Sequence, residues 1–193
     1  MPKIEVVYFE NGGPDNTDDA LQIAKSYAEK NNIRNIICAS TSGATGLKLI
    51  DSFDSEKFNL IIVTHASGFM KKNFQELLPE NREKIQQKPN AKILTSIHAF
   101  SGISRSFRKS LKVHTPVEII ARMLRSVFGD GLKVCIEIVL MAADAGFITC
   151  DQDVLAIAGT GRGADTVVLI RPAYTANFLD LRVKQILCKP NTW

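Results

Sequence analysis

Short apolar runs recur along the chain, and most of them are continuous rather than alternating with polar residues. They cover residues 4–9, 36–39, 60–63, 93–97, 154–158 and 167–170. A short continuous apolar run is typical of a strand that is covered on both faces, as in a parallel sheet. Residues 183–188 alternate between apolar and polar positions, which predicts one further strand.

Helical periodicities lie between these runs. Residues 17–31 carry apolar side chains at the i, i+3, i+4, i+7, i+8 spacing of an amphipathic helix, starting at Ala20. The more polar residues 74–88 form a second helical segment that Pro89 stops. Thr115 and the proline after it supply an N-cap and a first helical position for another helix.

This order of elements predicts one α/β domain over residues 1–193. The alternation of strands and helices implies a three-layer, doubly wound, mostly parallel sheet with helices on both faces. Residues 154–188 depart from the alternation because their strands have no full helices between them. We expect hairpin pairing or an antiparallel edge there, which makes the sheet mixed at its C-terminal end.

Composition narrows the class of protein. The chain is 45% hydrophobic and 23% charged, and no apolar stretch reaches the roughly 20 residues of a membrane span. Residues 1–9 lack the pattern of a secretion signal, so we expect a cytoplasmic protein. The net charge of +4 is small for a nucleic-acid-binding protein, and the four separated cysteines show no metal-ligand spacing. We therefore predict no nucleic acid, no membrane and no metal.

The loops that follow five of the strands carry glycine beside hydroxyl, amide or histidine side chains. Ligands of open α/β sheets bind at the carboxyl edge of the strands, where such loops meet, so we expect a binding pocket there. Outside residues 40–46, its candidate residues are Glu10, Asn16, Thr17, His65, Gly68, Phe69, His98, Gly159, Thr160, Gly161, Arg162, Gly163, Asp165 and Thr166.

The loop of residues 40–46 is the strongest of these signals. It follows an apolar run and precedes a short helical pattern, where the free N–H groups of a helix start can meet an anion. Its hydroxyls and glycines form either a phosphate cradle or an ordinary helix cap. The candidate ligand-binding residues are Ser40, Thr41, Ser42, Gly43, Ala44 and Thr45.

Two common nucleotide motifs fit this chain poorly. No Lys-Ser or Lys-Thr pair follows Gly46, which argues against a Walker loop and against nucleotide triphosphate hydrolysis. Gly159, Gly161 and Ala164 satisfy the G-x-G-x-x-A fingerprint of dinucleotide sites. The apolar, β-branched residues that follow replace the helix that such a site requires, which argues against NAD. Arg162, within this loop, is suited to clamp an anionic group.

Two charged segments leave alternatives open. Lys133, Glu137 and Asp144 form a single stripe on a nearly all-apolar helix predicted within residues 131–146. The stripe is either the solvent face of that helix or a polar line that reaches a ligand or a partner subunit. The basic segment 103–112 is a solvated face, a nucleic-acid patch or a region that steers phosphate.

The three histidines do not decide between an enzyme and a binding protein. His65 and His98 each follow a strand, where an imidazole either acts as acid, base or hydrogen-bond donor or is satisfied by loop backbone. His114 is expected to be exposed or structural. No nucleophile, base and orienting group are evident together, so no catalytic residue is assigned.

These loops resemble the stand-alone pyruvate kinase C-terminal-domain-like family. The resemblance spans essentially the whole chain and is carried by residues 9–10, 16–17, 39–45, 63–65, 68–69, 133–138, 141–146 and 159–166. In pyruvate kinase a similar Thr-Ser-Gly loop holds a phosphate of the allosteric sugar bisphosphate, and a later Gly-rich loop closes over that ligand. The resemblance implies that residues 40–45 hold phosphate.

The stand-alone family looks like flavin mononucleotide (FMN) binders, so the resemblance implies FMN as cofactor and a flavoprotein. The FMN phosphate would lie at residues 40–45, the ribityl chain along the hydroxyl-rich edge, and the ring near Phe69, His98 or Phe100. The catalytic barrel of pyruvate kinase is absent, so phosphoryl transfer to ADP is not implied. The alternative is a non-enzymatic sugar-phosphate sensor or assembly module, and either function is compatible with a homo-oligomer.

Overall fold

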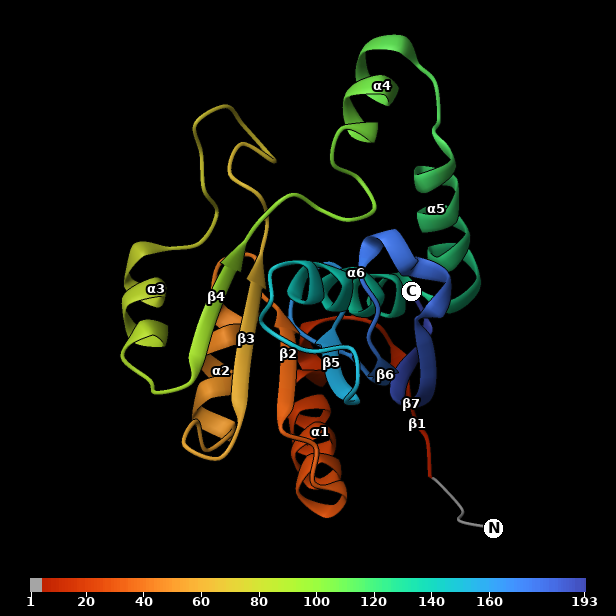
Figure 1. Ribbon diagram of the computed structural model, residues 1–193. Helices are drawn as coiled ribbons and strands as arrows, with labels where there is room; N and C mark the ends of the chain where they lie inside the picture. The colour runs from red at the N-terminus through yellow and green to blue at the C-terminus, as the bar shows by residue number, and fades with distance from the viewer. Residues whose placement is uncertain (1–4) are drawn as a thin grey trace.

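The computed structural model describes residues 5–193 and contains one sheet of seven strands (Figure 1). Only β6 runs antiparallel to its neighbours, β5 and β7, so the predicted mostly parallel, C-terminally mixed sheet is confirmed. Ile4, which the apolar pattern includes in the first strand, lies outside the described residues. In sheet order the strands are β1 (Val7–Asn11), β7 (Arg182–Thr192), β6 (Thr166–Arg171), β5 (Val154–Ala158), β2 (Asn35–Ala39), β3 (Asn59–Thr64) and β4 (Ala91–Thr95).

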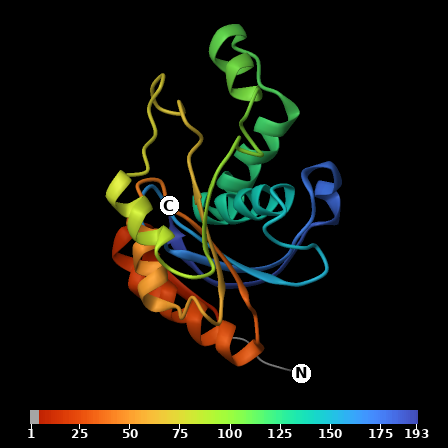
Figure 2. The same ribbon diagram turned by 60° about the vertical axis from the view of Figure 1, so that its left-hand side comes forward.

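Helices cover both faces of this sheet and complete the predicted three layers (Figure 2). On one face pack α1 (Thr17–Asn31), α2 (Ala44–Ser52) and α3 (Pro79–Gln86), and on the other α6 (Asp130–Asp144). Two short 3-10 helices, Pro14–Asn16 and Thr175–Asp180, lie in connections. No helix in the described part of the chain has the length and apolarity needed to cross a membrane.

The two apolar cores explain why the strands are continuous apolar runs. In β2, Ile36 and Cys38 belong to the core beneath α1 and α2, whereas Ile37 belongs to the core beneath α6. All three side chains are fully buried. Because successive residues of a strand point to opposite faces, a strand between two helical layers needs an apolar residue at every position.

Two element boundaries differ from the sequence expectation. The helix expected over residues 74–88 is shorter, since α3 begins only at Pro79 and residues 65–78 form a long connection. Pro79 occupies the first helical turn, and Asn73 has a left-handed φ of 60°, so the chain before it does not continue the helix. Strand β4 is Ala91–Thr95 rather than 93–97 because it pairs with β3, which ends at Thr64.

Helices α4 (Ser104–Leu111) and α5 (Pro116–Phe128) form an arm, residues 104–128, that projects from the body of the domain (Figures 1 and 2). Neither helix contains a buried residue. Contacts between α5 and α6 attach the arm to the body. The arm therefore extends the wall of the molecule beyond the sheet without a core of its own.

The carboxyl ends of all strands except β6 lie at one edge of the sheet, and β6 begins at the same edge. The hairpin turn from β5 to β6, residues 159–165, consequently lies beside the loops that follow β1 and β2. This placement brings glycine-rich loops from both ends of the chain to one place.

A buried carboxylate joins two of these loops. Asp165 is fully buried, and its Oδ2 accepts hydrogen bonds from the N–H of Gly13 at 2.9 Å and of Thr160 at 2.8 Å. Its Oδ1 accepts a hydrogen bond from the hydroxyl of Thr166 at 2.7 Å. In the same region the N–H of Ala164 donates to Thr17 Oγ1 at 3.0 Å. The loop after β1 and the β5–β6 turn therefore form one hydrogen-bonded unit.

Replacing this carboxylate should destabilise the protein strongly. Asp165→Ala leaves two buried donors and one part-buried donor without an acceptor, which should lower the free energy of unfolding by roughly 3 kcal/mol or more. Urea denaturation measures the loss. Asp51→Ala, at an exposed position of α2, is the matched control and should change stability by no more than about 0.5 kcal/mol. Equal stability of the two variants would show that Asp165 does not organise these loops.

Candidate functional site

A cavity of about 730 Å³ lies at the carboxyl edge of the sheet. Its walls come from the loops after β1, β2, β3 and β4, from the β5–β6 turn, from the arm and from α6. Seven Lys or Arg side chains and two Glu side chains line it, so its charge is strongly positive. A cavity of this volume, with this charge, is suited to an anionic small molecule.

One end of the cavity is the start of α2. Ser40 is buried, and its Oγ accepts a hydrogen bond from the N–H of Gly46 at 3.0 Å. The N–H groups of Ala44 and Thr45, in the first turn, have no acceptor within the helix, and both residues line the cavity. The positive end of the helix dipole adds to the attraction for an anion.

Gly43, at the N-cap of α2, allows this loop to pack closely. Its φ is 94°, and a Cβ there would lie 2.6 Å from Cβ of Asn81. The Asn81 side chain in turn donates a hydrogen bond to the carbonyl of Ser42 at 2.9 Å. A larger residue at position 43 would displace the loop from α3, so the cradle depends on glycine there.

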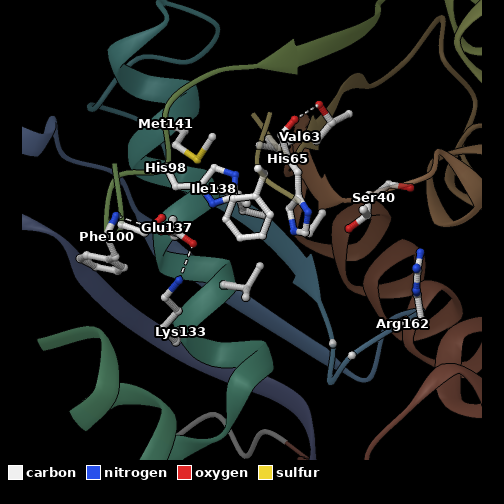
Figure 3. A pocket seen from close by; sticks show the side chains of 18 of the residues that line it. Ser40, Val63, His65, His98, Phe100, Lys133, Glu137, Ile138, Met141 and Arg162 are labelled. Carbon is white, nitrogen blue, oxygen red and sulfur yellow. Dashed lines mark hydrogen bonds and ion pairs between the residues drawn. The ribbon is translucent and has the colours of Figure 1, made fainter. Parts of the chain in front are cut away.

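Two cationic side chains border the same end. Figure 3 shows Arg162 and Ser40 on one side of the cavity. Arg162 is exposed and has no ion-pair partner among residues 5–193. Lys48, one turn into α2, pairs with Asp18 at 2.7 Å, where both side chains are exposed. Of these two cations, Arg162 is therefore the unpaired one, and its guanidinium is suited to bind a phosphate.

The middle of the cavity is aromatic. The rings of Phe69 and His98 stack at a centroid separation of 4.7 Å, and the His65 ring lies 4.3 Å from Phe69 and 5.2 Å from His98. Ile138 and Met141 of α6 add apolar surface to the wall. A flat ligand ring can lie against such surfaces.

His98 is a neutral imidazole with a defined tautomer. Burial, with smaller contributions from His65 and Lys133, lowers its pKa to about 4, although the charge of Glu137 raises it. The Nε2 atom accepts a hydrogen bond from the N–H of Ala66 at 3.1 Å. In the neutral ring the proton is consequently on Nδ1, which makes Nδ1 a hydrogen-bond donor.

His65 forms a pair with a carboxylate. Its Nδ1 lies 2.8 Å from Oε2 of Glu76, a residue of the long connection between β3 and α3. A carboxylate at Nδ1 orients the ring and leaves Nε2 as the second functional nitrogen. The side chain is one-third exposed and lines the cavity, so Nε2 is accessible to a ligand.

A buried ion pair closes the far end of the cavity (Figure 3). Lys133 Nζ and Glu137 Oε2 are 2.5 Å apart, and the two residues are 4% and 5% exposed. Glu137 Oε1 also accepts a hydrogen bond from the N–H of Phe100 at 2.9 Å. Burial lowers the pKa of Lys133, whereas the charge of Glu137 raises it. The ammonium has three donors, and this pair uses one of them.

The arm contributes the remaining charge. Arg108 pairs with Glu118 at 2.8 Å, and Arg125 pairs with Asp130 at 3.1 Å. Arg105 and Arg122 also line the cavity, and neither has an ion pair in the described part of the chain. Positive charge therefore remains uncompensated at the arm as well as at α2.

The sequence model described as "Pyruvate kinase, alpha/beta domain" matches residues 18–170, from the start of α1 to the end of β6. This match covers most of the chain. The chain belongs to the pyruvate kinase alpha/beta domain family. The resemblance drawn from the loop sequences is thereby confirmed, and the fold agrees with it. Strands β1 and β7 lie outside the matched residues.

In this pyruvate kinase-type domain, most of the predicted site residues border the cavity. Four others, Asn16, Thr160, Asp165 and Thr166, shape loops instead, through hydrogen bonds or burial. Glu10, Gly43 and Gly68 also do not line the cavity. The residues that do are Thr17, Ser40, Thr41, Ser42, Ala44, Thr45, His65, Phe69, His98, Gly159, Gly161, Arg162 and Gly163.

The structure decides between the alternatives for the charged segments of this domain. Lys133 and Glu137 are buried and line the cavity, so this part of the stripe is not a solvent face, whereas Asp144 is exposed and bonds to Thr175. Of the basic segment 103–112, Arg105 and Arg108 line the cavity. His114 lines it too, with half of its side chain exposed.

Several lining residues were missed by sequence reasoning. Glu118, Ala121, Arg122 and Arg125 follow the i, i+3, i+4, i+7 spacing of one helix face, a signal that the apolar face of the same helix obscured. Glu76 gave no signal, because its partner His65 is eleven residues away in an irregular connection. Only tertiary structure brings the two together.

The tautomer of His98 can be checked directly. An NMR titration should give a midpoint of about 4 for this ring. The unfolded chain takes up the proton near pH 6.5, so His98 should contribute stability that is present above about pH 6.5 and is lost as the pH falls to about 4. Nitrogen shifts at pH 7 should identify Nδ1 as the protonated atom. A midpoint near 6.5 would contradict the buried, neutral ring.

The Lys133–Glu137 pair can be tested by a double-mutant cycle. Glu137→Leu leaves a buried ammonium and the Phe100 N–H without an acceptor, which should cost about 3 to 5 kcal/mol in urea denaturation, and Lys133→Met is the other single variant of the cycle. Lys133→Met combined with Glu137→Leu removes both charges and should cost clearly less than the single Glu137 variant. Additive losses in the double variant would show that the two side chains are not coupled.

Proposed function

We propose that this cavity binds a phosphorylated small molecule, and that FMN is that molecule. The observation that carries the proposal is the order of chemical environments along one cavity. A helix start with Arg162 lies at one end, hydroxyls and aromatic rings follow, and a buried ammonium lies at the other end. FMN presents a phosphate, a polyhydroxyl chain and a flat ring with an electron-rich edge in the same order.

The phosphate belongs at α2 on electrostatic grounds. A phosphate monoester carries about −1.5 to −2 charges at neutral pH and accepts several hydrogen bonds. The N–H groups of Ala44 and Thr45 and the hydroxyls of residues 40–42 are donors of the right kind. Arg162 and Lys48 supply the compensating charge without requiring a metal.

The ring belongs beside Phe69 and His98. These two rings and the side chains of Ile138 and Met141 form the least polar part of the lining, where a flat heteroaromatic system is best accommodated. The Nδ1 donor of His98 and the two unused donors of Lys133 are available for its carbonyl and nitrogen acceptors. When bound, FMN would supply redox chemistry that no side chain of the cavity provides.

A sugar phosphate is the second candidate, because the chain belongs to the pyruvate kinase alpha/beta domain family and the arm adds cations that a monophosphate leaves unused. In that case the domain is a sensor or assembly module. Thermal unfolding with each added ligand separates the two candidates, since in this case a sugar bisphosphate would stabilise the protein and FMN would not.

Thermal unfolding of the purified chain with added FMN tests the proposal. A ligand that binds only the folded state at about 100 times its dissociation constant should raise the melting temperature by roughly 5 to 10 °C. Arg162→Met should weaken FMN binding by about tenfold, because it removes one charge-assisted contact to the phosphate.

Arg34→Met is the matched control, since Arg34 precedes β2 at the opposite edge of the sheet. This variant should bind FMN as the unaltered protein does. Lack of flavin absorbance in the protein as purified, together with no thermal stabilisation by saturating FMN, would refute the proposal.

A further inference from the structure

Two guanidinium groups of the arm line the cavity without an acidic partner among residues 5–193. The four arginines of this wall divide into two kinds. Arg108 and Arg125 are paired with Glu118 and Asp130, whereas Arg105 and Arg122 have no carboxylate within 4.0 Å among residues 5–193. The charges of the paired arginines are compensated by these carboxylates, whereas the unpaired arginines leave two positive charges at the cavity.

Arg105 is held in place by an aromatic ring rather than by an acid. Its guanidinium carbon lies 3.8 Å above the centroid of the Phe69 ring, and Nη2 donates to the carbonyl of Phe69 at 3.3 Å. Phe69 in turn stacks on His98. This stack fixes the plane of the guanidinium, so that its other N–H groups keep a constant direction.

The remaining donors of Arg105 lack partners. Its Nε is buried, yet it has no hydrogen-bond partner in the described part of the chain. An unpaired buried donor on a charged group is costly, and native structures rarely leave one empty without a function. A guanidinium with fixed orientation and free donors is the group that binds a planar carboxylate or a phosphate through two parallel hydrogen bonds.

We infer that Arg105 and Arg122 bind the carboxylate or phosphate of a second small molecule, which lies beside the phosphorylated ligand of the proposed function. The second molecule is small because both must share the cavity of about 730 Å³. It would lie next to His65, whose ring packs against Phe69 below Arg105. The inference rests on the proposed function only for the identity of the first ligand.

Titration calorimetry with inorganic phosphate and with malonate tests the site. With FMN present at saturation, the unaltered protein should still bind one of these anions, and the tighter of the two identifies the phosphate or the carboxylate as the preferred group. Arg105→Met and Arg122→Met should each weaken that binding by about 10- to 100-fold, while Arg122→Met changes FMN affinity by less than about threefold. Arg162→Met should do the reverse.

Two further variants separate directed binding from general charge. Arg105→Lys keeps the charge but loses the planar fork, so it should restore only part of the affinity. Lys112→Met removes an equal charge from the same arm at an exposed position that does not line the cavity, and it should leave anion binding unchanged. Arg122→Met covers the case in which Arg105→Met fails to fold, because Arg122 does not contact Phe69.

The outcomes are distinct from those of the proposed function. If FMN does not bind, the same titrations on the ligand-free protein should still show two classes of anion site, one sensitive to Arg162→Met and the other to Arg105→Met. Displacement of the anion by FMN, or anion binding that is unaffected by both arm variants, would overturn the inference.

Discussion

The buried carboxylate of Asp165 is the contact on which the geometry of the site depends. It accepts a hydrogen bond from Thr160 in its own turn and another from Gly13, which lies 152 positions earlier in the sequence. By this contact the turn from β5 to β6 is held against the loop after β1, where Gly163 packs so closely on Pro14 that a Cβ would lie 2.5 Å from its Cα. A rigid turn keeps Arg162 beside the start of α2. Without Asp165 the β5–β6 turn and the loop after β1 would not be held together at this end of the cavity.

Of the seven cationic side chains that line the cavity, three have no acidic partner among residues 5–193 and are free for a ligand. Glu137 pairs with the buried Lys133 ammonium and also accepts the Phe100 N–H, so neither charge of this pair is left without a partner in the apolar helix. His98 adds a neutral donor because its burial holds the proton off Nε2 at neutral pH. Arg105, Arg122 and Arg162 form no ion pair in the described part of the chain, so their positive field attracts anions at both ends of the cavity.

The sequence predicted the sheet well because burial on both faces leaves a direct trace, a continuous apolar run at each strand. It predicted the loops that line the cavity because glycine and hydroxyl residues follow several strands, and the carboxyl ends of parallel strands lie at one edge of the sheet. It placed Asp165 among the ligand-binding residues, whereas in the structure the carboxylate accepts hydrogen bonds from Gly13, Thr160 and Thr166. It could not find the His65–Glu76 pair or the Arg105–Phe69 stack, because each forms between segments whose relative position is set only by the long connection and the arm.

A crystal structure of the protein grown with FMN tests the central claim most directly. The account predicts the FMN phosphate within hydrogen-bonding distance of the N–H groups of Ala44 and Thr45, with the ring against Phe69 and His98. A phosphate bound elsewhere on the molecule, or an empty cavity at saturating FMN, would contradict it.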